Sequence, residues 1–347
     1  MIYFHNDYSE GCHPRILERL IATNDVQTTG YGEDEYCAQA AACIRKVCGR
    51  DDLAVHFLVG GTQANLIVIA AALRPHQAAL GPISAHINVH ETGAVEATGH
   101  KVLGVPSADG KITAEQVRTV VNTHRASGSF EHEAQPKLVY ISNPTELGTL
   151  YSLAELKALS ATCKELGLYL FMDGARLGYG LAAAENDMTM ADIANLCDVF
   201  YIGGTKVGAL FGEAVVISNP AINEDFRYLI KQRGGMLAKG RLLGVQFAAL
   251  MEDGLYFELG AHAVKLADRI RDTLDKLGVS YLVPGTTNQI FPILPDKLLG
   301  ELSKTFMFTE MERIDESHRA IRFCTSWASK PENVEALCKE LERLSAL

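Results

Sequence analysis

The sequence predicts an α/β protein in which helices flank a mainly parallel central sheet. Between about residues 54 and 218, short apolar runs alternate with segments of helical periodicity. The apolar runs are continuous, which is typical of parallel strands buried on both faces. Helix signals agree with this pattern, since Ser152 and Glu155 have capping-box spacing and Gly167 is well placed to end the same helix.

The elements of this larger part follow one another in strand–helix order. The first apolar run predicts a strand, and a glycine-rich turn after it opens a helix. The expected strands are 54–59, 137–142, 168–172, 199–203 and 214–218, and the expected helices are 63–74, 152–167 and 189–197.

A smaller α+β unit is expected after about residue 250. The expected helices are 256–277, 301–306 and a last one opened by Ser329 with Glu332; the expected strands are 281–284, 289–294 and 320–327. We therefore predict a large domain at 1–250, which includes an N-terminal arm at about 1–20, and a small C-terminal domain at 251–347.

Composition indicates an ordinary globular protein and excludes two classes of partner. Of the 347 residues 48% are hydrophobic and 21% are charged, and the formal net charge is −10. No basic stripe for nucleic acid exists, and no apolar run approaches the roughly 18 residues of a membrane helix. The eight cysteines form no C-x-x-C pair and the first residues carry no secretory pattern, so a cytoplasmic location is expected.

The stretch DVFYIGGTKVGALFGEAVVI contains a lysine in unusual surroundings. Between Asp198 and Glu213, Lys206 is the only charged residue, and apolar strand-like runs flank it. One interpretation is a lysine at a strand end that extends its ammonium to water. The other is a lysine in a closed site, where desolvation lowers the pKa of the amine and makes it nucleophilic.

Two further strand ends carry residues suited to a ligand. After the first strand, Gly61 and Thr62 open a helix, which indicates either a tight turn or an anion cradle at the helix N-terminus. After the run LYLFM, Asp173 is followed by Arg176. This pair fits either a structural ion pair or a carboxylate that keeps a heterocyclic nitrogen protonated.

Together these three strand ends specify pyridoxal 5'-phosphate (PLP). This cofactor needs a lysine, an acid for its pyridinium nitrogen and a cradle for its phosphate, and ligands of open α/β sheets collect at the carboxyl ends of the strands. A nicotinamide-dependent dehydrogenase would instead need a G-x-G-x-x-G turn, and the chain contains none.

The series of motifs resembles the low-specificity L-threonine aldolases of the β-eliminating-lyase group, which have the type I fold of PLP-dependent transferases such as aspartate aminotransferase. The segments that carry the resemblance are NDYSEGCHPRIL, GYGED, VGGTQANL, AHINVHETGA, FMDGARL, YIGGTKVGALFGEAVV and IRFCTSW. The resemblance spans nearly the whole chain.

This resemblance implies roles around the cofactor. Lys206 would form the imine and Asp173 would bind the pyridinium nitrogen. The phosphate would bind Gly61 and Thr62, with the Thr205 hydroxyl as a further donor, while His86 would stack on the ring. From the residues alone, His86 fits a hydrogen-bonded histidine at a strand end equally well.

The resemblance also implies roles around the substrate. Arg176 would lie near the cofactor and the substrate carboxylate, and Ser9 would face the substrate. Arg322 would clamp the carboxylate, since the guanidinium fork makes bidentate contacts. As a residue on its own, Arg322 could equally be a surface residue of an edge strand.

One position departs from the family pattern. Better-known members carry a histidine near the substrate β-hydroxyl, and Glu146 stands at its place. A carboxylate could accept the hydroxyl proton in its stead, and His90 is a further candidate. The spacing of His86, His90 and Glu91 lacks the H-E-x-x-H order and a third ligand, so no metal is expected.

The expected reaction is therefore PLP-dependent aldol cleavage of L-threonine, L-allo-threonine and related β-hydroxy-α-amino acids to glycine and an aldehyde. The alternatives are a PLP-dependent lyase that eliminates a β-substituent, an aminotransferase, or a PLP-binding module without turnover. The resemblance implies a homodimer or homotetramer with shared active sites. The basic segment 231–241 fits either a solvated turn or a group that reaches a cofactor phosphate, including that of a neighbouring subunit.

Overall fold

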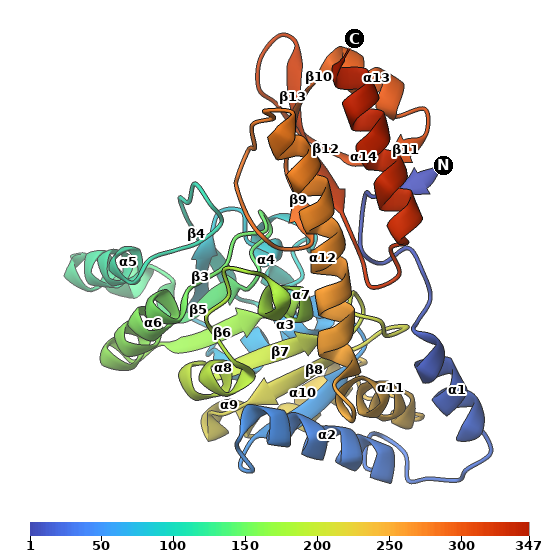
Figure 1. The fold of residues 1–347 in the computed structure, drawn as a ribbon. Helices are drawn as coiled ribbons and strands as arrows, with labels where there is room; N and C mark the ends of the chain where they lie inside the picture. The colour runs from blue at the N-terminus through green and yellow to red at the C-terminus, as the bar shows by residue number, and fades with distance from the viewer. Residues whose placement is uncertain (347) are drawn as a thin grey trace.

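The structure is a computed structural model that describes residues 1–346, with a larger part below a smaller one (Figure 1). Within the described residues, the larger part holds a seven-stranded sheet in the order β2-β8-β7-β6-β5-β3-β4. Its strands are β2 (Ala54–Leu58), β3 (Gln77–Pro82), β4 (Lys101–Val105), β5 (Gln135–Ser142), β6 (Tyr169–Asp173), β7 (Val199–Gly203) and β8 (Glu213–Ile217).

Helices surround this sheet and connect its strands (Figure 1). They are α1 (Pro14–Ala22), α2 (Glu35–Cys48), α3 (Gly61–Ala72), α4 (His86–Val89), α5 (Ala114–Ala126), α6 (Leu153–Leu166), α7 (Leu177–Ala182), α8 (Met190–Leu196), α9 (Pro220–Asn223), α10 (Phe226–Gln232), α11 (Arg241–Met251) and α12 (Leu255–Lys276), with 3-10 turns at Glu96–Thr98 and Phe130–His132.

Strand direction decides which residues meet at the edge of the sheet. Strands β3 to β7 pair in parallel, whereas β8 runs antiparallel to both β2 and β7. The carboxyl ends of β2, β5, β6 and β7 therefore share one edge with the amino end of β8. In this register Glu213, the first residue of β8, lies opposite Gly203, the last residue of β7.

The central strands β5 to β8 are buried on both faces, which explains why they are largely apolar, whereas the outer strands β2 and β4 are partly exposed. Successive residues such as Phe171 and Met172 belong to different hydrophobic clusters, one packed under α3 and α10 and the other under α2, α6 and α11. Each large apolar side chain buried in this way contributes about 1.5–3 kcal/mol. A strand with an exposed face would have alternated apolar and polar residues.

Glycines allow the turns after β6 and β7 to pack against each other. A Cβ atom on Gly203 would lie 2.3 Å from the backbone oxygen of Ala175, and one on Gly174 would lie 2.0 Å from that of Tyr201. Any side chain there would separate the two turns. This close approach brings Asp173 and Lys206 to one cavity.

The smaller part is built from the C-terminal residues together with the first residues of the chain. It comprises β1 (Ile2–Tyr3), β9 (Gln289–Ile290), β10 (Ile293–Pro295), α13 (Asp296–Leu302), β11 (Phe306–Met307), β12 (Thr309–Arg313), β13 (His318–Cys324) and α14 (Pro331–Ser345). Strand β1 pairs in parallel with β11, so the N-terminal arm runs along both parts.

The long helix α12 contributes to the cores of both parts (Figure 1). Its residues up to Val264 pack in the cluster beneath the large sheet, and those from Leu266 onward pack in the C-terminal cluster. The division into domains at residues 250 and 251 stays a prediction. Among the described residues, none of the helices is both long and apolar enough to cross a membrane.

The structure confirms most predicted elements of the larger part to within about two residues, including the capping box at Ser152 and the left-handed C-cap at Gly167. The C-terminal predictions were less accurate. Residues 281–284 contribute only an isolated bridge between Tyr281 and Pro292, and the strand predicted at 289–294 is divided into β9 and β10. Pro292, which has no N–H group, lies at the break.

One helix prediction near the C-terminus was also wrong, and the last helix is confirmed but starts at a different residue. The segment 301–306 contains the end of α13 and the start of β11. The last helix begins at Pro331 with Lys330 as its N-cap, and Ser329 instead accepts a hydrogen bond from the Ser326 backbone at 2.8 Å. Proline favours the first helical position, which sets this start.

Candidate active site

Eight of the ten predicted site residues line one cavity of about 330 Å³ at the carboxyl edge of the sheet. These are Gly61, Thr62, His86, Glu146, Asp173, Arg176, Thr205 and Lys206. They follow different strands, and only the parallel order of the sheet brings them together. Tyr8 of the N-terminal arm and Glu213 also line this cavity.

Lys206 lies in the turn after β7, and its side chain has no carboxylate within ion-pair distance among the described residues. Burial lowers the pKa of its ammonium, and the nearby charge of Arg176 lowers it further, whereas Asp7, Asp173 and Glu213 oppose the change. A lysine with a lowered pKa presents a larger fraction of neutral, nucleophilic amine. The alternative of a solvated lysine at a strand end does not fit this position.

Asp173 ends β6 and accepts hydrogen bonds from several donors. Its Oδ2 atom accepts from the Tyr140 hydroxyl at 2.5 Å and from Asn65 at 3.2 Å, and its Oδ1 atom accepts from the Ala175 backbone at 2.9 Å. Asp173 is therefore held by hydrogen-bond donors from three residues, and Arg176 pairs with Asp7 instead.

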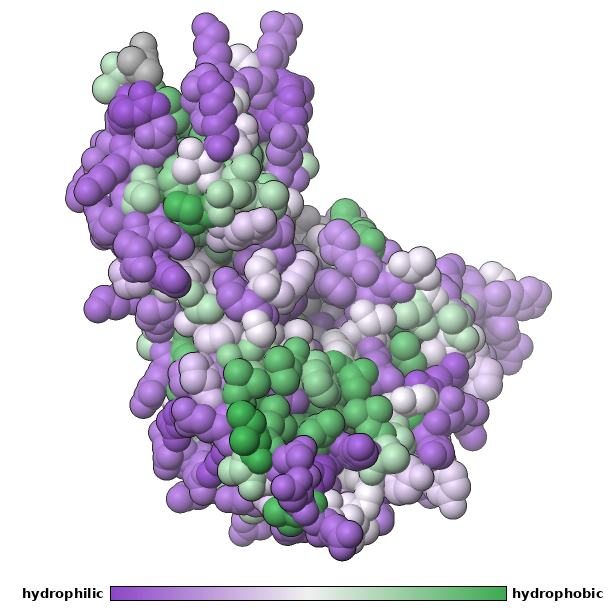
Figure 2. Space-filling view, turned by 90° about the vertical axis from the view of Figure 1, so that its right-hand side faces the viewer, coloured by the Kyte–Doolittle hydropathy of each residue, from purple (hydrophilic) through white to green (hydrophobic). Residues whose placement is uncertain are grey.

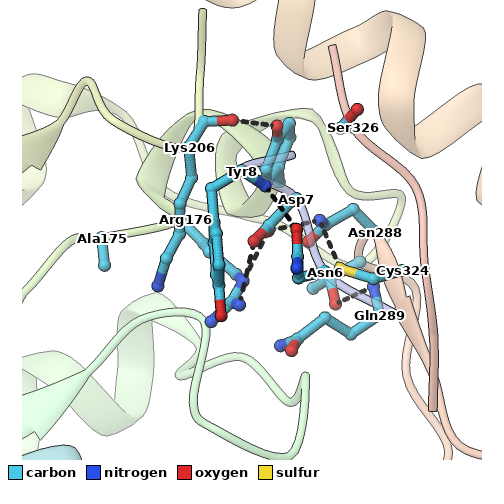
Figure 3. Close-up of polar contacts among 12 residues, drawn as sticks. Asn6, Asp7, Tyr8, Ala175, Arg176, Lys206, Asn288, Gln289, Cys324 and Ser326 are labelled. Atoms are coloured by element: carbon cyan, nitrogen blue, oxygen red, sulfur yellow. Dashed lines mark hydrogen bonds and ion pairs between the residues drawn. The ribbon is translucent and has the colours of Figure 1, made fainter. Parts of the chain in front are cut away.

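Arg176 does not pair with Asp173, which excludes the simple ion pair considered from the sequence. Its Nε and Nη2 atoms donate to the two oxygens of Asp7 at 2.7 and 3.1 Å (Figure 3). Burial alone would raise the pKa of Asp7, but the charges of Arg176 and Lys206 and two hydrogen-bonded partners lower it to about 2. Asp7 is therefore a carboxylate at neutral pH.

The start of α3 has the properties of an anion cradle. Its N-cap is Gly60, which has no side chain to bind the first N–H groups of the helix. Thr62 lies in the first turn of the helix and does not cap it. The N–H groups of the first turn therefore remain available to an anion at the cavity wall.

The Thr205 hydroxyl is engaged by a neighbouring carboxylate. It donates to Glu213 Oε1 at 2.8 Å and accepts from the Gly212 backbone at 3.0 Å. Burial raises the pKa of Glu213, while the hydrogen bond from Thr205 and the charge of Lys206 oppose the rise. Whether Thr205 can donate to a further group therefore depends on the protonation of Glu213.

His86 begins α4 and is fixed by a buried carboxylate. Its Nδ1 atom lies 2.8 Å from Glu91 Oε1, which also accepts from Asn65 at 2.7 Å. Burial favours neutral His86, but the hydrogen bond to Glu91 and the charge of Asp173 outweigh burial and raise the pKa of the imidazole. The ring of His90 lies 5.5 Å from that of His86.

Glu146 follows β5 and is half-buried in the cavity wall. Its Oε1 atom accepts from the Ser142 hydroxyl at 2.8 Å and from the His86 backbone at 3.0 Å, whereas Oε2 has no partner among the described residues. Burial and the charge of Asp173 raise the pKa of this carboxyl. A free oxygen and a raised pKa are the properties of a general base for neutral pH.

Arg322 and Ser9 do not line this cavity. Arg322 lies on β13, where its Nη2 atom donates to the His5 backbone oxygen at 2.9 Å and its Nε atom has no partner among the described residues. It has no carboxylate partner within the described part of the chain, and its charge lowers the pKa of His90. Ser9 is exposed and donates to Asn6 at 2.9 Å.

The basic segment 231–241 lies beside the start of α3 rather than in the cavity. Gln63 of α3 donates to the Arg233 backbone oxygen at 3.3 Å, and Lys231 lies over the ring of Tyr31. Arg241 donates to backbone oxygens of Thr23 and Val26. A contact of this segment with a cofactor phosphate stays a prediction.

Comparison with known proteins explains this arrangement. The family model of the beta-eliminating lyases matches residues 8–296. The chain belongs to the beta-eliminating lyase family. A low specificity L-threonine aldolase of Pseudomonas sp. strain NCIMB 10558 is 32% identical over 97% of this chain and 96% of its own, and that of Pseudomonas aeruginosa is 31% identical over the same shares.

Solved structures agree with the family. A threonine aldolase of Leishmania major has a TM-score of 0.97 and 47% identity, with 99% of this chain and all of that chain covered. An aspartate aminotransferase of Thermus thermophilus, at 15% identity, covers 99% of this chain and 91% of its own with a TM-score of 0.72. This beta-eliminating lyase family member therefore has the fold of aspartate aminotransferase, a type I fold of PLP-dependent enzymes.

In this family member, the sequence reasoning missed several residues that the fold brings to the site. Glu213 begins an antiparallel strand and so precedes it, whereas the predicted site residues at strand ends follow their strands. Asp7 lies in the N-terminal arm, where no periodicity marks it. Asn65 and Glu91 bridge Asp173 and His86. The lone charges in apolar segments were the available signal for Glu91 and Glu213.

Proposed function

We propose that this protein is a PLP-dependent aldolase that cleaves L-threonine, L-allo-threonine and related β-hydroxy-α-amino acids to glycine and an aldehyde. The observation that carries the proposal is Lys206, whose amine has a lowered pKa and shares a cavity with Asp173 and with the free start of α3. The names of the relatives in Pseudomonas and Leishmania support it.

The residues present fit the cofactor. Among residues 1–346, Lys206 has no ion-pair partner, and the first turn of α3 has no side-chain cap, so its N–H groups can bind a phosphate. Asp173 would hold the pyridinium nitrogen, His86 would pack on the ring, and Thr205 would add a donor. When bound, PLP supplies the electron sink that weakens a bond at the substrate Cα.

The protein itself would orient the substrate and move one proton. Arg322 has unpaired donor capacity and no carboxylate partner in the described residues, which suits it to the substrate carboxylate. Arg176 would contribute with the nitrogen that Asp7 leaves free. Glu146 Oε2 would accept the proton of the β-hydroxyl, and His86 is the alternative base.

A direct assay tests the reaction. Purified protein supplied with PLP should release acetaldehyde and glycine from L-threonine. Pyruvate from L-serine or L-cysteine without acetaldehyde from threonine would instead identify an enzyme that eliminates β-substituents, and a dependence on a keto acid would identify an aminotransferase. Absence of all these products would contradict the proposal.

A chemical experiment tests the anchor. Borohydride reduction followed by peptide mapping should place a pyridoxyl group on Lys206, and Lys206→Ala should remove it. A pyridoxyl group on another lysine, or none in PLP-supplemented protein, would contradict the assigned site.

The oligomeric state forms part of the same proposal. Figure 2 shows a contiguous apolar patch on the side of the larger part that carries α1, and Leu17 and Ile21 of α1 are exposed large apolar residues. Apolar patches of this kind are typical of subunit interfaces. Light scattering should find a homodimer or homotetramer, and Ile21→Glu should weaken it. The cytoplasmic location stays a prediction based on the unpaired cysteines.

A further inference from the structure

Asp7 lies at the meeting point of three separate parts of the chain. It comes from the N-terminal arm and is completely buried. Its Oδ2 atom accepts from Arg176 Nε at 2.7 Å and from Asn288 Nδ2 at 2.9 Å, and its Oδ1 atom accepts from Arg176 Nη2 at 3.1 Å. Figure 3 shows the carboxylate between Arg176, which follows β6, and Asn288, which precedes β9.

The arm holds Asp7 in place independently of Arg176. The backbone oxygen of Phe4 accepts from the Cys324 N–H at 2.7 Å, and that of His5 accepts from the Thr309 hydroxyl at 2.8 Å. Strand β1 is paired with β11 just before these residues. Asp7 can therefore impose a position on the guanidinium rather than follow it.

The charges of Asp7 and Arg176 both affect the pKa of Lys206. Arg176 and Lys206 are two cations in the wall of one cavity, where an unbalanced guanidinium would be costly to bury and would repel a protonated amine. Asp7 opposes the effect of Arg176 on the Lys206 pKa. The other ionisable groups around Lys206 are Asp173, Glu213, His86, Glu146, Tyr8, Tyr201 and the Cys324 thiol, and the Tyr179 hydroxyl donates to the Lys206 backbone oxygen.

We propose that Asp7 is a positioning residue of this active site, which fixes the Arg176 guanidinium through a two-pronged ion pair and balances its charge beside Lys206. The role assigned to the site rests on the proposed function. The charge balance between Asp7, Arg176 and Lys206 does not rest on the proposed function, because it can be measured in the full-length protein without cofactor.

The test measures how fast the Lys206 amine reacts. The pH dependence of acetylation by acetic anhydride is first measured on the cofactor-free wild-type protein. All variants are then treated at one pH below the midpoint of that dependence, and acetylation of Lys206 is quantified by peptide mass spectrometry. Only the neutral amine reacts. Asp7→Asn should accelerate acetylation about tenfold and Arg176→Gln should slow it about tenfold, since a charge within a few ångströms shifts a pKa by roughly one unit or more.

Further variants separate charge from structure. The double variant D7N/R176Q should return the acetylation rate of Lys206 to near the wild-type value. Arg176→Lys, which keeps the charge, should leave the pH midpoint of acetylation nearly unchanged. Asp253→Asn, at an exposed ion pair with Arg15, is the matched control. A purely structural role would accelerate labelling in every variant of the pair, because loosening exposes the amine.

The outcomes are decisive in each case. The proposal would be overturned if D7N and R176Q changed the acetylation rate of Lys206 in the same direction, or if neither changed it. If D7N does not fold, R176Q decides, since an unchanged or faster reaction in that variant contradicts the charge balance. If the wild-type protein does not cleave threonine but the acetylation rates of the variants change as expected, the proposed function is refuted and this inference still holds.

Discussion

The Glu213 carboxylate accepts a hydrogen bond from the Thr205 hydroxyl at 2.8 Å, and the two residues lie on opposite sides of the β7–β8 turn. Glu213 also accepts from the Gly204 backbone at 3.0 Å. Its pKa is raised by burial, so its ionisation lies closer to neutrality than that of an exposed glutamate. When ionised, Glu213 retains the Thr205 proton and repels a phosphate.

We therefore expect binding of the cofactor phosphate to weaken as the pH rises through the Glu213 pKa. A PLP analogue without the aldehyde isolates this effect from imine formation. Glu213→Gln should remove the pH dependence and bind the analogue about tenfold more tightly at alkaline pH, the equivalent of roughly one pKa unit. The unphosphorylated analogue is the control, and an equal pH dependence for it would assign the effect to another group.

Glu146 is expected to set the pH profile of the chemical step. Because burial raises its pKa, kcat should rise with pH as the carboxyl ionises and becomes able to accept the β-hydroxyl proton. Glu146→Gln should lower kcat by about 10²–10⁴-fold and remove this limb of the profile. Ser142→Ala, which removes a hydrogen bond to the carboxylate, should displace the limb to higher pH. An unaltered profile in both variants would favour His86 as the base.

Arg322 is expected to govern substrate affinity more than turnover. Arg322→Gln should raise KM for threonine roughly 10- to 100-fold, since hydrogen bonds between charged groups contribute about 1.5–3 kcal/mol. Arg319→Gln, on the same strand but paired with Asp296 and Glu310 at the surface, is the matched control and should leave KM unchanged. Steady-state kinetics with both variants provides the test. Equal rises in the KM for threonine would contradict a role of Arg322 in binding the substrate carboxylate.

The buried pair of Asp7 and Arg176 predicts a specific loss of stability in acid. The pKa of Asp7 is lowered from 3.8 to about 2, so its contribution is complete above the unfolded-state pKa and is lost as the pH falls through that interval. Asp7→Asn should cost about 3–5 kcal/mol at neutral pH, because it leaves Arg176 buried without its partner. Urea unfolding between pH 2 and about pH 5 should show a flatter pH dependence in the variant.

Much of the large domain was predictable because burial on both faces leaves a local signal. Runs such as 199–203 are apolar at every position, and Ser152 with Glu155 forms the capping box that its spacing predicts. The C-terminal part was less predictable, since its short strands depend on pairing with distant partners. Residues 281–284 form only a bridge for this reason.

The sequence by itself determined five of the seven strands of the large sheet, the order of their ends along the chain and the lone lysine after β7, because burial, caps and glycine turns act between near neighbours, whereas β3 and β4 were not predicted. Tertiary structure alone decided which charges face Lys206. Asp7 reaches Arg176 from the far end of the chain, and Glu213 reaches Thr205 because β8 runs antiparallel. Electrostatic effects depend on distance in space, and local sequence patterns do not report that distance.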